Sequence, residues 1–252
     1  MSSKAFIVTG ASRGLGLAVA QALIQASHKV FLVARTENDL QALKTQHPSS
    51  VEFMAADLAD LKIAPKVIES TIKAFGKIDG IVVNHGVLSP ITKIFESSAE
   101  EWRHAYDINV FSALALIKEA IPELRKSEGR VIFISSGAAF GAYSGWGSYG
   151  TSKAALTHLC AHLAVEEPSI TSVAISPGRL NTEMQKEIRE QGKAGMTPEA
   201  YESFVDDHKS GRLVDPQKPA HVIAMLVNGA TRDLNGKHFR YNAAELASYR
   251  EE

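Results

Sequence analysis

The sequence predicts an α/β fold in which helices cover both faces of one doubly wound sheet of seven parallel strands. Short runs of β-branched and apolar residues alternate with longer helical stretches along the 252 residues. This alternation is typical of parallel strands joined by helical crossovers. Most strand segments are continuously apolar, as expected for strands that are covered on both faces. A glycine-rich turn directly follows the first strand. We therefore expect one domain over residues 1–252.

The expected elements follow one another as strand, helix and strand from the start of the chain. The first unit is a strand over 6–9, a helix over 15–26 and a strand over 30–34. Further strands are expected over 51–55, 80–84, 130–135, 172–176 and 237–241.

Two long helices are expected before and after the strand at 130–135. The first covers 98–126 and opens with a capping box of Ser98 and Glu101. The second covers 149–166. The polar stretch 185–215 interrupts the alternation, and Thr197 followed by Pro198 is a suitable start for a helix there. We predict a helical insertion at 185–215 that acts as a lid over the substrate.

Composition narrows the class of protein. The chain is 45% hydrophobic and 22% charged, as soluble globular proteins are, and its formal net charge is −1. That balance provides neither a basic footprint for nucleic acid nor a polybasic membrane patch. The first strand leaves no room for a cleaved signal peptide, and no apolar run reaches the roughly 18 residues of a membrane span. The single cysteine, Cys160, suits a reducing cytosol, and we expect it to be an inert core thiol.

The glycine-rich turn after the first strand predicts a dinucleotide site. Glycines at such a turn let backbone amides approach a pyrophosphate at the positive end of the following helix. A turn of this kind alone also occurs without a ligand, but the context of strand, turn and helix favours a Rossmann-type site. The expected contact residues of the turn are Gly10, Ser12, Arg13, Gly14, Leu15 and Gly16.

The end of the second strand favours NADP over NAD. An NAD site usually has a carboxylate there that binds the ribose hydroxyls. This strand instead ends in Arg35, which together with Arg13 can bind a 2′-phosphate through charge-assisted hydrogen bonds. Both arginines could also be simple surface residues, and the nearby Glu37 leaves NAD open.

Tyr149 and Lys153 are the candidate proton-transfer pair. Residues four apart lie on the same face of a helix. A free tyrosine is a weak acid near neutral pH, and a neighbouring cation lowers the pKa of a phenol. The pair can therefore protonate a carbonyl oxygen as hydride reaches the carbon. The same spacing is also common on helix surfaces that have no catalytic role.

The chain resembles the short-chain dehydrogenases/reductases over nearly its whole length. The resemblance is carried, in order, by the glycine turn, Asn84-His85-Gly86, Ser136, Tyr149 with Lys153, and Pro177-Gly178. Within that family the second half is most similar to fungal benzil reductases and more distantly to sepiapterin reductases. This closer similarity is carried by residues 143–146, 149–156, 166–168, 184–186 and 240–242.

The resemblance implies roles for four residues in catalysis. Tyr149 is the general acid and base, and Lys153 lowers its pKa and binds the nicotinamide ribose. Ser136 holds the substrate carbonyl, which leaves Ser135 a structural role. Asn109 supports a water-mediated proton relay to the lysine.

The resemblance also implies further cofactor contacts. They are Asp57 and Leu58 beside the adenine, Asn84 and Gly86 along the adenosine, and Pro177, Gly178, Leu180 and Thr182 near the nicotinamide carboxamide. His85 is a departure, because the family commonly has alanine there. It can narrow the floor of the site, contact the cofactor, or be a tolerated substitution, and the last interpretation is preferred.

The expected activity is NADPH-dependent reduction of a ketone, preferably a 1,2-diketone such as benzil, to a hydroxyketone. An apolar pocket suited to such substrates can be lined by Phe140, Tyr143, Trp146, Met184, Met196 and Phe204. Each of these can instead be ordinary core packing. Trp146 is favoured because it lies in a glycine loop beside Tyr149. A pterin substrate is the alternative, although sepiapterin reductases use an aspartate near the C-terminus where this tail offers Glu245.

Other classes of function stay open at this point. A non-catalytic module that senses NADP is one, although such proteins usually lack one of the three catalytic residues. A lyase or epimerase is another. His158 and His162 are spaced to hold a metal, but a packed or interface face suits them better, and no metal is expected. The resemblance further implies a homodimer or homotetramer that uses the two long helices.

Overall fold

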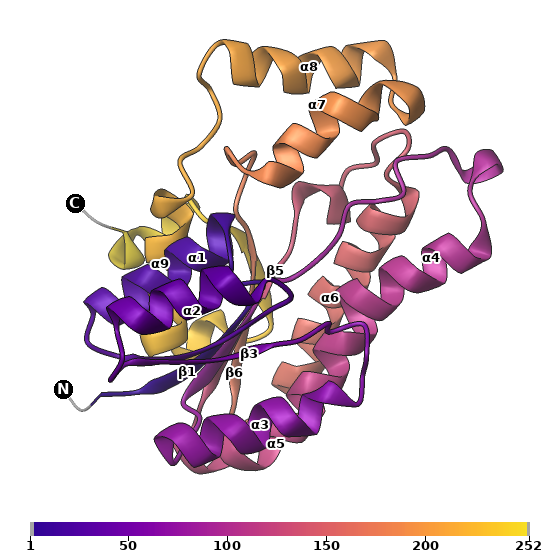
Figure 1. Cartoon of the computed structure of the whole chain (residues 1–252). Coiled ribbons are helices and arrows are strands. Elements are labelled where there is room, and N and C mark those ends of the chain that lie inside the picture. Colours follow the sequence, from indigo (N-terminus) through magenta and orange to yellow (C-terminus); the bar gives the residue numbers. More distant parts are fainter. Residues whose placement is uncertain (1–2, 251–252) are drawn as a thin grey trace.

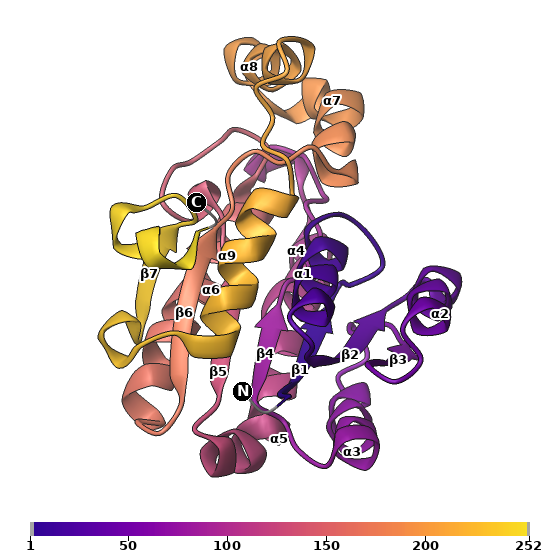
Figure 2. The same ribbon diagram turned by 90° about the vertical axis from the view of Figure 1, so that its left-hand side faces the viewer.

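The computed structural model describes residues 3–250 and contains one sheet of seven parallel strands. Their spatial order is β3-β2-β1-β4-β5-β6-β7, which matches the predicted doubly wound sheet (Figure 2). The strands are β1 (Ala5–Thr9), β2 (Lys29–Ala34), β3 (Val51–Ala55), β4 (Gly80–Val83), β5 (Arg130–Ile134), β6 (Thr171–Ser176) and β7 (Lys237–Arg240).

Helices cover both faces of this sheet, as predicted (Figure 2). One face carries α1 (Gly14–Gln25), α2 (Glu37–Gln46) and α9 (Gln217–Gly229); the other carries α3 (Ile63–Phe75), α5 (Ser112–Ser127) and α6 (Gly147–Glu166). Successive side chains of β1 point to opposite faces, so Phe6 and Val8 pack with the first group of helices and Ile7 with the second. The strands between the two edges of the sheet are therefore buried on both faces, whereas the edge strands β3 and β7 are only partly covered.

The order of the strands reverses between β1 and β4. From β1 the chain moves outward to β2 and β3, and then returns past β1 to β4 and continues to β7. In open parallel sheets, ligands bind in the crevice that such a reversal leaves at the carboxyl ends of the strands. The topology alone thus locates a site after Thr9 and Val83.

The helix predicted over 98–126 is one helical path with a change of winding inside it. It consists of α4 (Ala99–Tyr106), a π-helical turn (Asp107–Phe111) and α5. The predicted capping box is present, since Ser98 and Glu101 exchange side-chain and backbone hydrogen bonds. Turns of π-helix frequently occur at functional sites, and this one contains Asn109.

The stretch at 185–215 contains most of α7 (Glu183–Gly195) and all of α8 (Pro198–Lys209). The Thr197 hydroxyl caps α8 by accepting from the amide of Ala200. Both helices lie beyond the carboxyl edge of the sheet, away from the layers that cover its faces (Figure 1). They are therefore placed over the crevice rather than over the hydrophobic core.

The remaining elements are short. They are the 3₁₀ helices Ile94–Glu96, Gly137–Ala139, Arg232–Leu234 and Ala244–Tyr249. Strand ends differ from the prediction by one residue at several places. The prediction placed Asn84 in β4, but its amide donates to the Thr9 hydroxyl instead of to a strand carbonyl. Within residues 3–250, no helix is both long enough and apolar enough to cross a membrane.

Candidate active site

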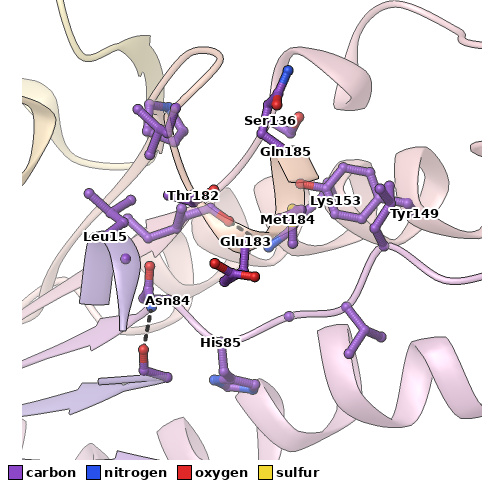
Figure 3. A pocket seen from close by; sticks show the side chains of 18 of the residues that line it. Leu15, Asn84, His85, Ser136, Tyr149, Lys153, Thr182, Glu183, Met184 and Gln185 are labelled. Atoms are coloured by element: carbon purple, nitrogen blue, oxygen red, sulfur yellow. Dashed lines mark hydrogen bonds between the residues drawn. The ribbon is translucent and has the colours of Figure 1, made fainter. Parts of the chain in front are cut away.

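One large cavity lies at the carboxyl edge of the sheet, and its volume is about 1070 Å³. Its walls come from the turns that follow all seven strands, from the start of α6, and from α7 and α8. Figure 3 shows the part of the cavity between Leu15, Tyr149 and Met184. Most residues predicted for catalysis and cofactor binding line this cavity. They are Gly10, Ser12, Arg13, Gly14, Leu15, Arg35, Asp57, Leu58, Asn84, Gly86, Ser136, Tyr149, Lys153, Pro177, Gly178, Leu180 and Thr182. Four predicted residues do not line it, namely Gly16, Asn109, Phe140 and Met196.

The glycine turn is packed so tightly that side chains are excluded at two positions. Gly10 has a φ of +64°, and a Cβ there would lie 2.9 Å from Nδ2 of Asn84. That Asn84 amide donates to the carbonyls of Thr9 at 3.0 Å and of Gly10 at 3.2 Å. A Cβ on Gly16 would lie 2.2 Å from the Gly10 carbonyl. Gly16 is therefore a packing residue of the turn and, unlike Gly10 and Gly14, does not line the cavity.

The end of the cavity near the turn after β2 carries the positive charge expected at a phosphate-binding site. Arg13 and Arg35 are exposed and line it, together with Asp57 and Leu58. Glu37, the residue that kept NAD open, is exposed at the start of α2 and does not line the cavity. A dinucleotide extended from the glycine turn would thus meet guanidinium groups at this end.

The three residues predicted for proton transfer and carbonyl binding converge on one part of the cavity (Figure 3). Ser136 follows β5, and its hydroxyl accepts from the amide of Ala138 at 3.2 Å. Tyr149 and Lys153 are buried on α6. The Lys153 ammonium donates to the Ile134 carbonyl at 2.8 Å and lies 5.9 Å from the centroid of the Tyr149 ring. Helix α6 and the end of β5 together fix this group.

The pKa values in this part of the site are set first by burial. Burial raises the pKa of Tyr149, and the hydrogen bond with Ser136 opposes that increase. Burial also lowers the pKa of Lys153 to about 8. The sequence predicted a lowered pKa for Tyr149, and the direction in the structure is the opposite. The reason is that the apolar surroundings disfavour the phenolate more strongly than nearby groups favour it.

Asn109 lies beside this group rather than on the cavity surface. It is fully buried; its Oδ1 accepts from the Val87 amide at 2.8 Å, and its Nδ2 donates to the Val87 carbonyl at 2.9 Å and to Ser152 Oγ at 3.0 Å. A Cβ on Gly86 would lie 3.1 Å from Asn109 Oδ1 and 3.3 Å from Lys153 Nζ. Asn109 therefore clamps the backbone that passes beneath Lys153.

A wall of aromatic side chains lies beside Tyr149 in the cavity. Trp146 packs on Tyr149 with ring centroids 5.8 Å apart, and Tyr143 and Phe204 pack on Trp146 at 4.9 and 5.1 Å. The sequence predicted that the three aromatic residues of this wall and Met184 line the cavity, and the structure places all four in its lining.

Phe140 is a wrong prediction. Its side chain is 65% exposed and packs on the ring of His238 at 4.3 Å, outside the cavity. It belongs to a 3₁₀ turn that leads away from β5, so its position in the sequence near Ser136 does not bring it to the substrate. Met196 is buried in the packing beneath the wall and does not line the cavity either. Glu245, considered for a pterin, is likewise exposed and outside it.

The sequence interpretation missed the contacts that hold the aromatic wall. Arg179 stacks on Phe204, with its guanidinium carbon 3.8 Å from the ring centroid, and donates to Asp207 at 2.6 Å. Arg212 donates to the other oxygen of Asp207 at 2.8 Å. The amide of Gln185 donates to the Phe204 carbonyl at 2.9 Å. The spacing of Phe204 and Asp207, three apart in a helix, was the only signal available for this arrangement.

Two further predictions concern groups away from the cavity. Cys160 is buried, and burial raises the pKa of its thiol to about 12, so it is an inert core thiol as expected. His158 and His162 lie with ring centroids 4.7 Å apart on α6. In the part of the chain that the structure describes, no group of three or more histidine, cysteine or acidic side chains is arranged to hold a metal.

Comparison with known proteins identifies the family. The model for "short chain dehydrogenase" matches residues 4–193. A Saccharomyces cerevisiae benzil reductase, described as forming (S)-benzoin, is 40% identical over 96% of this chain and 97% of the relative. An oxidoreductase of Schizosaccharomyces pombe is 39% identical over 96% of this chain and 98% of its own length.

Solved structures agree with this similarity. The crystal structure of the enzyme KRED1-Pglu has a TM-score of 0.92 and 39% identity, and it covers 94% of this chain and all of that one. A short chain dehydrogenase/reductase from Saccharomyces cerevisiae has a TM-score of 0.97 and 36% identity over 99% of this chain and all of that one. With its family match over most of its length and with relatives this similar, the chain belongs to the short-chain dehydrogenase family of oxidoreductases.

Proposed function

We propose that this chain is an NADPH-dependent reductase of bulky ketones that converts 1,2-diketones such as benzil to hydroxyketones. The observation that carries the proposal is the shared cavity, in which Ser136, Tyr149 and Lys153 lie beside a wall of aromatic rings. The benzil reductases among the similar proteins, from Saccharomyces cerevisiae and Bacillus cereus, support the choice of substrate.

The cradle fits a dinucleotide. Gly10 and Gly14 line the cavity without side chains, so the backbone of the turn can approach a pyrophosphate there. Arg13 and Arg35 would hold a 2′-phosphate, and the position of Glu37 outside the cavity supports NADPH over NADH. The bound nicotinamide supplies the hydride.

The residues of this chain hold the ketone and move its proton. The Ser136 hydroxyl donates a hydrogen bond to the carbonyl oxygen. The raised pKa of Tyr149 keeps its hydroxyl protonated at neutral pH, so the hydroxyl can give its proton to the same oxygen as negative charge develops there. The ammonium of Lys153 then stabilises the phenolate, because an opposite charge nearby favours the ionised form.

Helices α7 and α8 act as the lid over this reaction. Met184 of α7 and Phe204 of α8 both line the cavity beside Trp146. A bulky aromatic ketone would pack against this wall beside Tyr149 and exclude water from the carbonyl. The size of the substrate is therefore selected by the lid, while the proton transfer is performed by α6 and the end of β5.

The quaternary state is also part of the proposal. The structure exposes Phe111 and Leu114 around the start of α5 and Val165 near the end of α6, with 43%, 46% and 81% of their surface accessible. Exposed apolar residues on the two long helices support a homodimer or homotetramer in the cytoplasm. Light scattering of the eluted protein checks the assembly, and a monomer at micromolar concentration would contradict it.

The function is tested by initial rates with a panel of carbonyls. Benzil, a small diketone such as diacetyl, a quinone and a pterin are each assayed with NADPH and NADH in parallel. We expect benzil to be reduced fastest and NADPH to be the better cofactor. Turnover of none of them would favour the non-catalytic sensor, a best rate with the pterin would favour the alternative substrate, and equal rates with NADH would overturn the interpretation of the arginines.

A further inference from the structure

His85 is a buried titratable group that the proposed mechanism does not use. It is the second residue after β4, between Asn84 and Gly86, and only 9% of it is exposed. Figure 3 shows its ring below Asn84, on the side away from Tyr149 and Lys153. Burial, followed by the charge of Lys153, lowers the pKa of His85 to about 3. The ring is therefore neutral under ordinary conditions.

Both ring nitrogens are occupied by hydroxyl groups of the protein. Nδ1 lies 2.7 Å from Oγ1 of Thr9, and Nε2 lies 2.6 Å from Oγ of Ser112. The ring is therefore not free for a polar contact to the cofactor, and the two hydrogen bonds set His85 apart from a mere tolerated substitution.

The two partners belong to different parts of the site. Thr9 is the last residue of β1 and immediately precedes Gly10 of the cofactor turn. Ser112 is the first residue of α5 and immediately follows the π-turn that contains Asn109. The imidazole thus spans the distance between the cofactor turn and the element that clamps the backbone beneath Lys153.

The surrounding acceptors determine which nitrogen carries the hydrogen. A neutral imidazole has one donor and one acceptor. On the Nε2 side, the Ser112 hydroxyl already donates to the Ile108 carbonyl at 2.5 Å, so its oxygen is left to accept from the ring. On the Nδ1 side, the Thr9 hydroxyl has only a longer alternative, the Val82 carbonyl at 3.2 Å. The fewest hydrogen bonds are lost in the tautomer in which Nε2–H donates to Ser112 and Nδ1 accepts from Thr9.

We propose that His85 is a positioning residue for catalysis, whose neutral ring, carrying its hydrogen on Nε2, fixes the π-turn against the cofactor turn. It acts through Asn109, which holds both the amide and the carbonyl of Val87. Gly86 and Val87 form the floor beneath Lys153, so a shift of the π-turn displaces that floor. The inference rests on the proposed function, because the group being positioned is the proposed proton-transfer group.

Loss of the ring is not expected to unfold the chain. In His85→Ala both hydroxyls keep a backbone carbonyl as acceptor, Val82 for Thr9 and Ile108 for Ser112. A change in kcat of His85→Ala therefore reports a change in the position of the π-turn and not a loss of the fold.

The kinetic test compares His85→Ala, Ser112→Ala and the double variant with the wild type, using NADPH and benzil. We expect kcat to fall about tenfold in each single variant, since small displacements of reacting groups are costly. The dissociation constant for NADPH should stay within about threefold, because the phosphate contacts remain. The double variant should be no slower than the worse single variant, because both changes break one connection. His85→Gln, which keeps one donor and one acceptor, should recover part of the lost kcat.

Three kinetic results would overturn the inference. The first is a wild-type kcat in both single variants although they are folded. The second is a double variant whose kcat falls by the product of the two single-variant factors. The third is an unchanged kcat together with weaker NADPH binding. Thermal unfolding of each variant separates a displaced floor from a damaged fold, because a positioning effect lowers kcat without a matching loss of unfolding temperature.

The tautomer is measured on the wild-type chain and needs no substrate. In ¹⁵N-histidine NMR, the His85 signal is the one of nine that disappears in His85→Ala. We expect a hydrogen on Nε2, none on Nδ1, and no titration between about pH 5 and pH 8. A hydrogen on Nδ1, or a charged ring, would contradict the inference. If the proposed function is wrong, the wild-type chain will reduce none of the carbonyl compounds. In that case the NMR result still tests the proposed tautomer of His85.

Discussion

Two regions of the cavity, its floor and its lid, are held by different kinds of interaction. The floor consists of the cofactor turn with Arg35, the proposed proton-transfer residues and the backbone beneath Lys153, and the lid is formed, as proposed, by α7 and α8. In the floor, the polar side chains of Asn109 and Lys153 are buried and hydrogen-bonded, largely to backbone atoms. In the lid, helix α8 is tied to the loop after β6 by Arg179 and Asp207, whose side chains are 32% and 19% exposed. The floor therefore has few alternatives to its present geometry, whereas the lid depends on contacts that water can replace.

This difference matches the task of each region. Proton transfer requires atoms held in one geometry, and buried hydrogen bonds are costly to leave unmade. Substrate selection requires a wall that opens and closes, and such elements come from the less stable parts of a fold. Changes in the floor are thus expected to affect kcat, and changes in the lid are expected to affect the KM of bulky substrates.

Removal of the tyrosine hydroxyl should have the largest effect on the floor. For Tyr149→Phe we expect kcat with benzil to fall by about 10² to 10⁴, the usual contribution of a positioned proton donor. The affinity for NADPH, measured by fluorescence titration, should be nearly unchanged. Tyr106→Phe, which alters a ring that packs on Phe111 away from the cavity, is the matched control. Near wild-type turnover in Tyr149→Phe would end the assignment.

The cofactor end of the floor is tested by Arg35→Gln. A charge-assisted hydrogen bond to a phosphate contributes about 1.5–3 kcal/mol, so the KM for NADPH should rise by about one to two orders of magnitude. The KM for NADH should stay the same, because NADH lacks that phosphate. Arg103→Gln, an exposed change on α4, controls for the loss of charge. A parallel rise of both KM values would show that Arg35 acts on the fold and not on the 2′-phosphate.

The charge of Lys153 predicts how the floor responds to pH. Burial lowers the pKa of this lysine to about 8, so its charged form predominates below that pH and is lost above it. The profile of kcat/KM, which reports the free enzyme, should therefore decline by about tenfold per pH unit above about pH 8. In Lys153→Arg the guanidinium stays charged, so any residual activity should lose this alkaline limb. Retention of the same limb in that variant would assign it to another group.

The smallest effect is expected in the lid. Burial raises the pKa of Asp207, but the hydrogen bonds from Arg179 and Arg212 outweigh it and hold that pKa below its usual value. The ionic contact is therefore complete at neutral pH and weakens only as acid protonates the carboxylate. Asp207→Asn should raise the KM for benzil about two- to fivefold, the range for partly exposed ion pairs. Its KM for diacetyl should not change.

The neighbouring exposed Asp206 is the control for that change. It lies on the same helix and carries the same charge, and its side chain is exposed, so Asp206→Asn should leave both substrates unaffected. An equal loss for benzil and diacetyl in Asp207→Asn would mean that lid and floor are not separable.

The sequence predicted the floor better than the lid. The helical spacing of Tyr149 and Lys153 and the turn at Gly10 are local patterns, and local patterns carry over to the structure directly. Phe140 was misplaced because the direction of a loop is set by tertiary packing. The pKa of Tyr149 had the wrong direction because burial is a property of the assembled fold.

Longer-range relations were also beyond the sequence. Asn84 contacts Thr9, which is 75 positions away, and His85 contacts Ser112, which is 27 positions away. The spacing of residues along a helix or strand cannot predict contacts over such separations. The π-turn around Asn109 interrupts a segment whose pattern reads as one helix. Sequence patterns therefore predicted residues that the structure brings together in one cavity, but not the network of contacts that supports them.

The central claim is that hydride passes from NADPH to a diketone carbon beside Tyr149. It is tested most directly by incubating the wild-type chain with benzil and NADPH that carries deuterium at C4 of the nicotinamide, on either face, and examining the product by mass spectrometry and NMR. We predict benzoin with one deuterium on the carbinol carbon from one of the two labelled cofactors. Absence of benzoin, or benzoin without deuterium from both cofactors, would contradict the claim.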